Sequence, residues 1–258
     1  MLTKFIYGLN NSEGSVGLHV KHAIIDYCSI DDDAFLAILP LIPNIEIFEI
    51  DGAEGLTDKS VTQIFRFCKE LKSIWLSQAQ ASYQSALSLA QYHQLQSLSL
   101  KSCTNMTSKV LLPFSVLPIK SLLLCDWNKW LTVNETACDL QLFTHLTSLS
   151  IASVIAINPQ FFYTLLKNSN GIPCFPQLKV FHLEGTLSQE SYDDRGIALF
   201  LKTHPGIRDL SLLLCNISDN SINTIAHHLP DLECLWVVDC VKVSAQAVRQ
   251  MIYRCPKL

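Results

Sequence analysis

Ten cysteines and eight histidines are the side chains of this sequence with the most reactive chemistry, because thiolates and imidazoles bind metals and act as nucleophiles or bases. No two cysteines form the Cys-x-x-Cys pair that zinc and redox sites use. Cys125-Asp126 and Cys138-Asp139 are chance neighbours, and the nine glycines form no phosphate-cradling motif. We therefore predict no catalytic residue, no metal site and no cofactor, and we interpret the protein as a non-enzyme.

Composition and charge narrow the range of partners. Apolar residues make up 49% of the chain, which is enough for a folded core. The 19 basic and 23 acidic residues give the wrong balance for an electrostatic nucleic-acid footprint, so we expect no nucleic-acid partner. The most apolar long window, 140–166, is interrupted by His145 and Asn158-Pro159, so we expect no membrane span. The apolar run before Asn10 is too short for a secretory leader, and we expect a soluble cytoplasmic protein with reduced thiols.

The elements that position these residues follow from an internal repeat. A template of the form L-x-x-L-x-L-x-x-C recurs nine times at intervals of 24 to 32 residues. Its first position is Val20, Ile45, Leu71, Leu95, Ile119, Leu146, Leu178, Ile207 and Leu232. Its fourth position is Ala23, Phe48, Ile74, Leu98, Leu122, Leu149, Phe181, Leu210 and Leu235. Its sixth position is Ile25, Ile50, Leu76, Leu100, Leu124, Ile151, Leu183, Leu212 and Val237. All of these positions are apolar although only about half of the chain is, so composition alone does not explain the pattern.

Within a repeat, the spacing predicts a short strand followed in most repeats by a helix. In the segment x-L-x-L-x the apolar side chains point inward and the x side chains point outward. The predicted helix N-caps are Ser218, Ser244, Asn158 and either Thr57 or Asp58. We predict loops over 167–176 and 188–195, and Pro113 and Pro118 predict a turn or a single helical turn in the fourth repeat.

One strand and one helix of about 26 residues cannot bury their own apolar side chains, so the repeats must stack and share a core. The predicted fold is an α/β leucine-rich repeat solenoid, a horseshoe with a parallel concave sheet and convex helices. We interpret residues 1–19 as an N-terminal cap segment and residues 20–258 as a repeat domain of about nine repeats. Because Leu258 would open a tenth repeat and no polar cap follows it, we expect the parent protein to continue beyond residue 258.

Two repeats carry a family signature, Ile207-Arg-Asp-Leu-Ser-Leu-Leu-Leu-Cys215 and Leu232-Glu-Cys-Leu-Trp-Val-Val-Asp-Cys240. They resemble the cysteine-containing leucine-rich repeats, which occur in F-box substrate receptors of ubiquitin ligases. The resemblance extends over essentially the whole chain and includes the second family cysteine, as in Cys68-Lys-Glu-Leu71 and Cys255-Pro-Lys-Leu258. The ninth position is cysteine at Cys28, Cys103, Cys215 and Cys240, but it is Ala53, Ala79, Trp127, Val154 or Thr186 elsewhere.

This departure, and a segment before Val20 that is too short for an F-box, leave a second resemblance open. Degenerate repeats of this kind also look like the leucine-rich repeat effectors of intracellular bacterial pathogens. Because the repeated cysteine points into the stack, where cysteine behaves as a small apolar residue, we predict a packing role for it. Cys234 and Cys240 occupy an outward and an inward position, so we do not expect them to bind zinc together.

The outward third, fifth and seventh positions of each repeat would form the concave face, which is our candidate binding site. Repeats one and two place His22, Ile24, Asp26, Ile47, Glu49 and Asp51 there. Repeats three to six place Ser73, Trp75, Ser77, Ser97, Ser99, Lys101, Ser121, Leu123, Ser148 and Ser150 there. Repeats seven to nine place Val180, His182, Glu184, Asp209, Ser211, Leu213, Cys234, Trp236 and Val238 there. The run Asp31-Asp32-Asp33 lies beside the acidic end and is either part of the binding surface or ordinary solvated charge.

From this face we predict that a partner contacts Asp26, Glu49, Asp51, Trp75, Ser99, Lys101, Leu123, His182, Glu184, Leu213, Trp236 and Val238. Trp75 and Trp236 are the predicted anchors, because exposed aromatic side chains on a rigid sheet dominate many interfaces. The alternative for Trp236 is that a terminal cap or a further repeat covers it.

The predicted function is that of a protein-protein interaction module, monomeric and without a cofactor, which binds another protein on its concave face. The resemblances allow an effector that acts in the host cytoplasm or, as the alternative, the substrate-recognition part of a ubiquitin ligase complex. A structural scaffold without a ligase is the third alternative.

Overall fold

The computed structural model describes residues 17–26, 30–103, 105, 108–126, 133–153, 159–167, 173–185 and 192–258. The chain forms two compact units, residues 1–119 and 120–258. The predicted Asn158 cap, and Cys28, Trp127, Val154 and Thr186 at the ninth position, lie outside the described residues.

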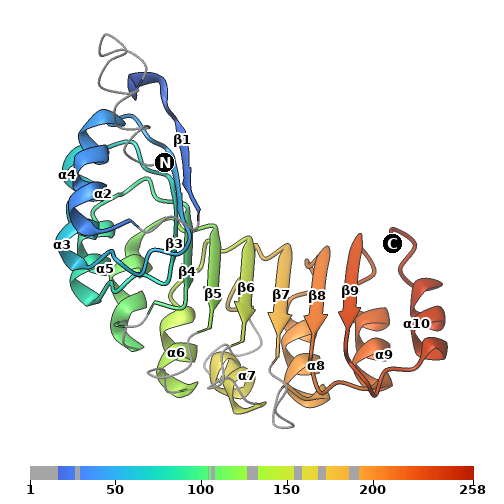
Figure 1. The fold of residues 1–258 in the computed structure, drawn as a ribbon. Coiled ribbons are helices and arrows are strands. Elements are labelled where there is room, and N and C mark those ends of the chain that lie inside the picture. Colours follow the sequence, from blue (N-terminus) through green and yellow to red (C-terminus); the bar gives the residue numbers. More distant parts are fainter. Residues whose placement is uncertain are drawn as a thin grey trace. The chain divides into compact units, whose positions relative to one another are not determined.

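The N-terminal unit is a parallel sheet with helices on one side (Figure 1). Its strands lie in chain order, with Phe48, Ile74 and Leu98 opposite one another in register. The strands are β1 (His22–Ile25), β2 (Ile47–Ile50), β3 (Ser73–Ser77) and β4 (Ser97–Lys101). The α-helices are α2 (Asp32–Ile38), α3 (Asp58–Val61), α4 (Ile64–Phe67) and α5 (Tyr83–Leu89). The 3-10 helices are η1 (Gly17–His19), η2 (Leu39–Leu41) and η3 (Ser108–Val116).

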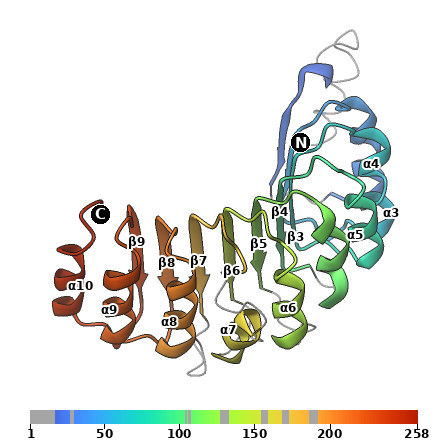
Figure 2. The same cartoon turned by 180° about the vertical axis from the view of Figure 1, so that it is seen from behind.

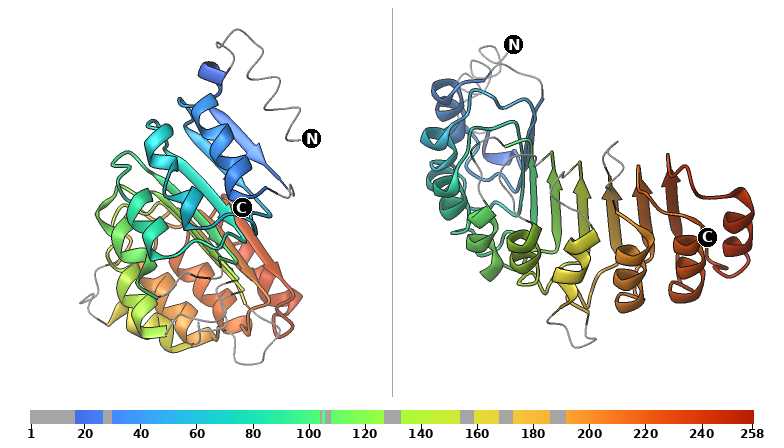
Figure 3. Two further views of the ribbon diagram at one scale, coloured as in Figure 1. Left: turned by 60° about the vertical axis from the view of Figure 1, so that its left-hand side comes forward. Right: turned by 90° about the horizontal axis from the view of Figure 1, so that it is seen from below.

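The C-terminal unit repeats this design. Its strands also run parallel in chain order, and its helices lie along one side of them (Figures 2 and 3). The strands are β5 (Ser121–Cys125), β6 (Ser148–Ala152), β7 (Val180–Glu184), β8 (Asp209–Leu213) and β9 (Cys234–Val238). The helices are α6 (Val133–Leu140), α7 (Pro159–Leu166), α8 (Asp194–Thr203), α9 (Asp219–His228) and α10 (Ala245–Ile252). The predicted solenoid of parallel strands and alternating helices is therefore confirmed.

The core of each unit consists of the first, fourth and sixth positions of the repeats. These side chains are buried except Val20, Ala23, Leu235 and Val237, which are half-buried and belong to the first and last repeats. Complete burial of a Leu or Ile side chain contributes about 2 kcal/mol, so this register is a main source of stability.

The eighth position, directly after each strand, has a backbone conformation that the sequence did not reveal. Six non-glycine residues there have a φ between 51° and 62°: Gln78, Ser102, Asp126, Ser153, Leu214 and Asp239. Gly52 occupies the same position with a φ of 72°. This left-handed conformation directs the backbone N–H of the eighth residue towards a carbonyl of the next repeat. The Leu214 N–H, for example, donates to the Val238 carbonyl at 2.9 Å.

Helix starts confirm the predicted caps at Thr57, Ser218 and Ser244, each of which accepts a bond from a backbone N–H in the first turn. The prediction of a turn or a single helical turn in the fourth repeat is wrong, because η3 continues for nine residues. Pro113 lacks an N–H and lies inside η3, which forms as a 3-10 helix rather than an α-helix. The predicted loop over 188–195 is wrong at its end, because Asp193 caps α8 and Asp194 begins it.

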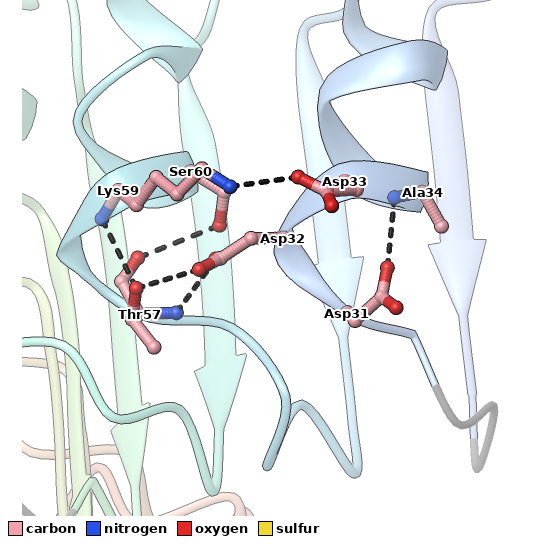
Figure 4. Close-up of polar contacts among 7 residues, drawn as sticks. All are labelled: Asp31, Asp32, Asp33, Ala34, Thr57, Lys59 and Ser60. Carbon is pink, nitrogen blue, oxygen red and sulfur yellow. Dashed lines mark hydrogen bonds and ion pairs between the residues drawn. The ribbon is translucent and has the colours of Figure 1, made fainter.

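A carboxylate ladder joins helix N-termini of successive repeats within each unit. Asp32 accepts bonds from the Thr57 N–H at 2.9 Å and from Thr57 Oγ1 at 2.7 Å (Figure 4). Asp58 accepts equivalent bonds from Ser82. In the C-terminal unit Asp194 accepts bonds from Ser218, and Asp219 accepts bonds from Ser244. The acceptor is the first residue of one helix, and the donor is the N-cap of a helix in the next repeat.

The ladder explains the run Asp31-Asp32-Asp33. Asp31 caps α2 by accepting a bond from the Ala34 N–H at 2.8 Å, Asp32 belongs to the ladder, and Asp33 pairs with Lys59 at 2.7 Å (Figure 4). Burial raises the pKa of Asp32, but hydrogen bonds from Ser60 and Thr57 outweigh it and lower the pKa below the usual value. The run therefore has a structural role at the start of a helix.

Candidate partner-binding face

Side-chain alternation creates a second face on each sheet, opposite the helices. In β4, β5, β6 and β7 the inward residues are buried and the outward third, fifth and seventh positions are half-buried. We call the outward positions of each unit its open face. The register places Glu49, Trp75 and Ser99 opposite one another in the N-terminal unit, and His182, Ser211 and Trp236 in the C-terminal unit.

The open face of the N-terminal unit combines exposed apolar side chains with acids at its beginning. Ile24 is 62% exposed and Ile47 is 36% exposed. Glu49 Oε1 lies 2.9 Å from His22 Nε2, and Asp51 Oδ1 accepts a bond from the Gly52 N–H. Asp26 is exposed, whereas Asp51, Ser99 and Lys101 are half-buried.

Trp75 and Ser77 lie deeper in this face than expected. Trp75 is half-buried, and its Nε1–H is shielded from solvent without a hydrogen-bond partner among the described residues. Ser77 is fully buried, so the prediction that it lies on the exposed face is wrong. A serine side chain is short, and Ser77 lies opposite the much longer Lys101 and two residues after Trp75 on the same face.

The open face of the C-terminal unit carries its most exposed aromatic residue at the last strand. Trp236 is 60% exposed, and its Nε1–H donates to Cys234 Sγ at 3.2 Å, which orients the ring along β9. Val238 is 39% exposed, and Leu213 beside it is half-buried. We call Leu213, Trp236 and Val238 the Trp236 patch. The prediction that Ser211 is exposed is wrong, because this small residue lies between His182 and Trp236 and is buried.

Acidic side chains lie beside the Trp236 patch. Asp209 Oδ1 is 3.3 Å from His182 Nε2, and Glu184 Oε1 accepts a bond from Ser153 Oγ at 3.4 Å. Leu123, on β5 of the same unit, is half-buried. The twelve predicted contact residues therefore divide between two open faces, with Asp26, Glu49, Asp51, Trp75, Ser99 and Lys101 on one and the other six on the second.

The described cysteines at the ninth position are buried and bond to the backbone of the preceding repeat. Cys103 Sγ–H reaches the Leu76 carbonyl at 3.6 Å, and Cys240 Sγ–H reaches the Leu212 carbonyl at 3.4 Å. Burial raises the pKa of Cys103 to about 12, so the thiol stays protonated, unlike a metal ligand or a nucleophile. Within the described ranges, no three His, Cys, Asp or Glu side chains gather as they would around a metal ion.

The sequence did not single out the contact between Cys174 and His204. Cys174 Sγ lies 3.6 Å from His204 Nε2, which also accepts the Phe175 N–H at 3.3 Å, while Nδ1 lies 2.9 Å from the Phe200 carbonyl. Burial lowers the pKa of His204 to about 4 and raises the pKa of Cys174 to about 12. This pair is neutral and joins a loop to the end of α8, whereas a catalytic pair needs a thiolate.

A positional signal could have located His204. It lies three residues before the first position of its repeat, where the other described repeats carry apolar or weakly polar residues such as Ile42, Tyr92, Phe143 and Leu229. A histidine in this buried position needs partners for both ring nitrogens, and the Cys174–Phe175 segment and Phe200 supply them.

Comparison with known proteins supports the fold and leaves the family open. No protein-family model and no curated protein sequence matches this chain. A chain from the crystal structure of the Rad7 and Elc1 complex in yeast is similar with a TM-score of 0.68 and 16% identity, over 88% of this chain and 57% of that one. A chain from the TLR13–ssRNA13 complex is similar with a TM-score of 0.51 and 14% identity, over 92% of this chain and 30% of that one.

At these identities the similarities show the leucine-rich repeat fold alone. The chain spans little more than half of the first matched chain and less than a third of the second. Among the described helices, none combines the length and the apolar character needed to cross a bilayer.

Proposed function

We propose that this protein is an interaction module that binds a partner protein on the open faces of its parallel sheets, the concave side of the predicted solenoid. The observation that carries the proposal is the exposure of the Trp236 side chain, which is 60% exposed on β9. The hydrogen bond from its Nε1–H to Cys234 Sγ orients the ring. An aromatic side chain that is already ordered loses little entropy when a partner covers it.

Charge favours a protein over a nucleic acid as the partner. The outward positions of β5–β9 include Glu184 and Asp209 and no Lys or Arg, so this surface repels phosphate groups. Because a chain of similar fold was crystallised with ssRNA13, the preference for a protein partner rests on this charge and not on the fold.

The proposed setting is the cytoplasm, because the described cysteines are all free thiols and several are buried in the core. The similarity to a chain from a complex with Elc1 gives some support to a role as the recognition part of a larger assembly, such as a ubiquitin ligase. An effector that binds host proteins in the cytoplasm remains our first proposal, with residues 20–258 as a single monomeric repeat domain of the cysteine-containing kind.

The test is affinity capture with matched variants. Partners captured by the wild-type protein should be lost or strongly reduced with the Trp75→Ala/Trp236→Ala double variant and retained with Tyr163→Ala, which removes an exposed aromatic residue from helix α7. Equal capture by the wild-type and double-variant proteins, both folded by circular dichroism, would contradict the proposed face. Preferential recovery of nucleic acid would contradict the proposed partner class.

A further inference from the structure

We propose that the C-terminal end of the open face, formed by β7, β8 and β9, binds a basic segment of the partner in which Lys or Arg side chains flank an apolar anchor. This inference rests on the proposed function and adds the chemistry of the partner. It follows from the distribution of ion pairs, from the Trp236 patch and from the strand register.

Several acids outside the open faces are neutralised by basic side chains of the protein itself. Glu46 pairs with Lys21 at 3.0 Å and with Lys72 at 2.6 Å, Glu233 pairs with Arg208 at 3.1 Å, and Asp231 pairs with Lys257 at 2.7 Å. These acids lie just before the strands and outside the open face, Glu46 and Glu233 at the second position of a repeat and Asp231 immediately before a first position. Their charge is therefore already compensated without a partner.

Acids on the open face of the C-terminal unit lack such compensation. Among the described residues, neither Glu184 nor Asp209 has a Lys or Arg within ion-pair distance, and the ion pair of Asp209 is with His182. The side chains of His182 and Asp209 are 40% and 36% exposed, so the carboxylate is accessible from solvent. Two carboxylates without a Lys or Arg partner favour a binding segment that supplies such cations.

The Trp236 patch supplies the apolar part of the same site. Glu184, Leu213 and Val238 lie opposite one another across β7, β8 and β9, and Trp236 lies two residues before Val238 on the same face. With strands about 4.8 Å apart, this row is about 10 Å wide, which an extended segment crosses in about three residues. If an apolar side chain of the partner segment lies over Leu213 and Trp236, a basic residue two positions away in the same segment is within reach of Glu184 or Asp209.

Trp236 favours the same partner chemistry. Its ring edge is occupied by the bond to Cys234 Sγ, and the side chain remains 60% exposed. An indole face attracts Arg and Lys, most strongly when the pair is partly desolvated. The acids and the ring therefore both favour cations, and the outward positions of β5–β9 carry no Lys or Arg that would compete for them.

The experiment uses three labelled peptides and the full chain, with binding followed by fluorescence anisotropy. The probe R-S-L-S-R-S-L-S-R presents Arg and Leu on one side of an extended chain, E-S-L-S-E-S-L-S-E reverses the charge, and R-S-S-S-R-S-S-S-R lacks the anchors. We expect the first peptide to bind at least about tenfold more tightly than either of the others. Its affinity should fall as salt rises from about 50 to about 500 mM.

Variants assign the binding to the site. Glu184→Gln/Asp209→Asn should weaken binding of the basic peptide about tenfold, and Trp236→Ala about thirtyfold. The matched controls should leave it unchanged: Glu233→Gln removes a paired acid outside the face, and Tyr253→Ala removes an 89% exposed aromatic residue of the same repeat. Circular dichroism checks that each variant is folded.

Two outcomes would overturn the inference: equal binding of the acidic and basic peptides, or unchanged binding of the basic peptide to Glu184→Gln/Asp209→Asn. A natural partner that requires Trp236 but tolerates the loss of both acids would leave the proposed function standing and refute the proposed chemistry. If the natural partner is lost with Glu184→Gln/Asp209→Asn and still binds Glu233→Gln, the result supports both the proposed function and the proposed partner chemistry.

Discussion

Replacing Asp194 by alanine removes the acceptor of four hydrogen bonds at the start of helix α8. The donors are the Ser218 N–H at 2.8 Å, Ser218 Oγ at 2.6 Å, the Ser221 N–H at 3.2 Å and Ser221 Oγ at 2.6 Å. Ser221 is fully buried, so water does not readily replace the lost acceptor. A bond to a charged group contributes about 1.5 to 3 kcal/mol, but bonds that share one carboxylate are not additive. We expect Asp194→Ala to lower the free energy of unfolding by about 3 kcal/mol.

The pH dependence gives this prediction a second readout. Burial raises the pKa of Asp194, but bonds from Ser218 and Ser221 outweigh it, so the pKa is lower in the folded than in the unfolded protein. The unfolded state therefore binds the proton first, and the stabilisation is complete above the unfolded value of about 4 and lost as the pH falls through the folded value. The difference between wild-type protein and Asp194→Ala should be largest at neutral pH and shrink in acid.

Urea unfolding followed by circular dichroism measures both effects. Asp33→Ala is the matched control, because the Asp33 side chain is 84% exposed and makes one surface ion pair, whose removal should cost less than about 1 kcal/mol. Equal unfolding free energies for wild type and Asp194→Ala at neutral pH would refute the structural role of the ladder. A difference of the same size in acid would show that the carboxylate charge is not its source.

Three further predictions concern the backbone and the buried groups. Leu214→Asn should raise the free energy of unfolding by about 0.5 to 1 kcal/mol and Leu214→Val should lower it, because asparagine tolerates the φ of 52° and a β-branched residue does not. A higher thermal unfolding temperature for Leu214→Val than for Leu214→Asn would contradict this prediction. Stability should fall by up to about 3 kcal/mol as the pH drops from about 6.5 towards 4, because the unfolded protein protonates His204 before the folded one does. Urea unfolding of His204→Phe should show no such fall in stability over this pH range. The same pH dependence in His204→Phe and the wild-type protein would contradict the prediction. Iodoacetamide should modify exposed Cys138 in the native protein and spare buried Cys103 until the protein is denatured, and mass spectrometry showing equal rates would exclude the packing role.

Periodicity was sufficient to predict the strands and the core, because one register determines which side chains face the helices. The buried Ile74 and Leu98 and the caps Ser218 and Ser244 follow directly from spacing. The same register placed Trp236 on the opposite side of its strand, where it is exposed.

What the spacing did not predict depends on side chains one repeat away. Ser77 was expected on the exposed face, but its accessibility depends on the size of its neighbours, including Lys101 on the next strand. The run Asp31-Asp32-Asp33 suggests a charged surface, whereas Asp32 bonds to Thr57, which lies 25 residues later. The contact of Cys174 with His204 spans 30 residues and joins a loop to a helix end, which no strand or helix period encodes.

The arrangement of the ladder has a consequence for how such a chain can lengthen. Ser218 donates to Asp194 of the preceding helix, and the adjacent Asp219 accepts from Ser244 at the start of the following helix. We call such a pair of adjacent residues a junction, because it holds the donor half of one connection and the acceptor half of the next. Duplication of a whole period from one such junction to the next would give every new helix start its donor and its acceptor at once. An insertion of any other length inside the period would separate the halves, so tandem copying of complete units is the change in length that this architecture accommodates most readily.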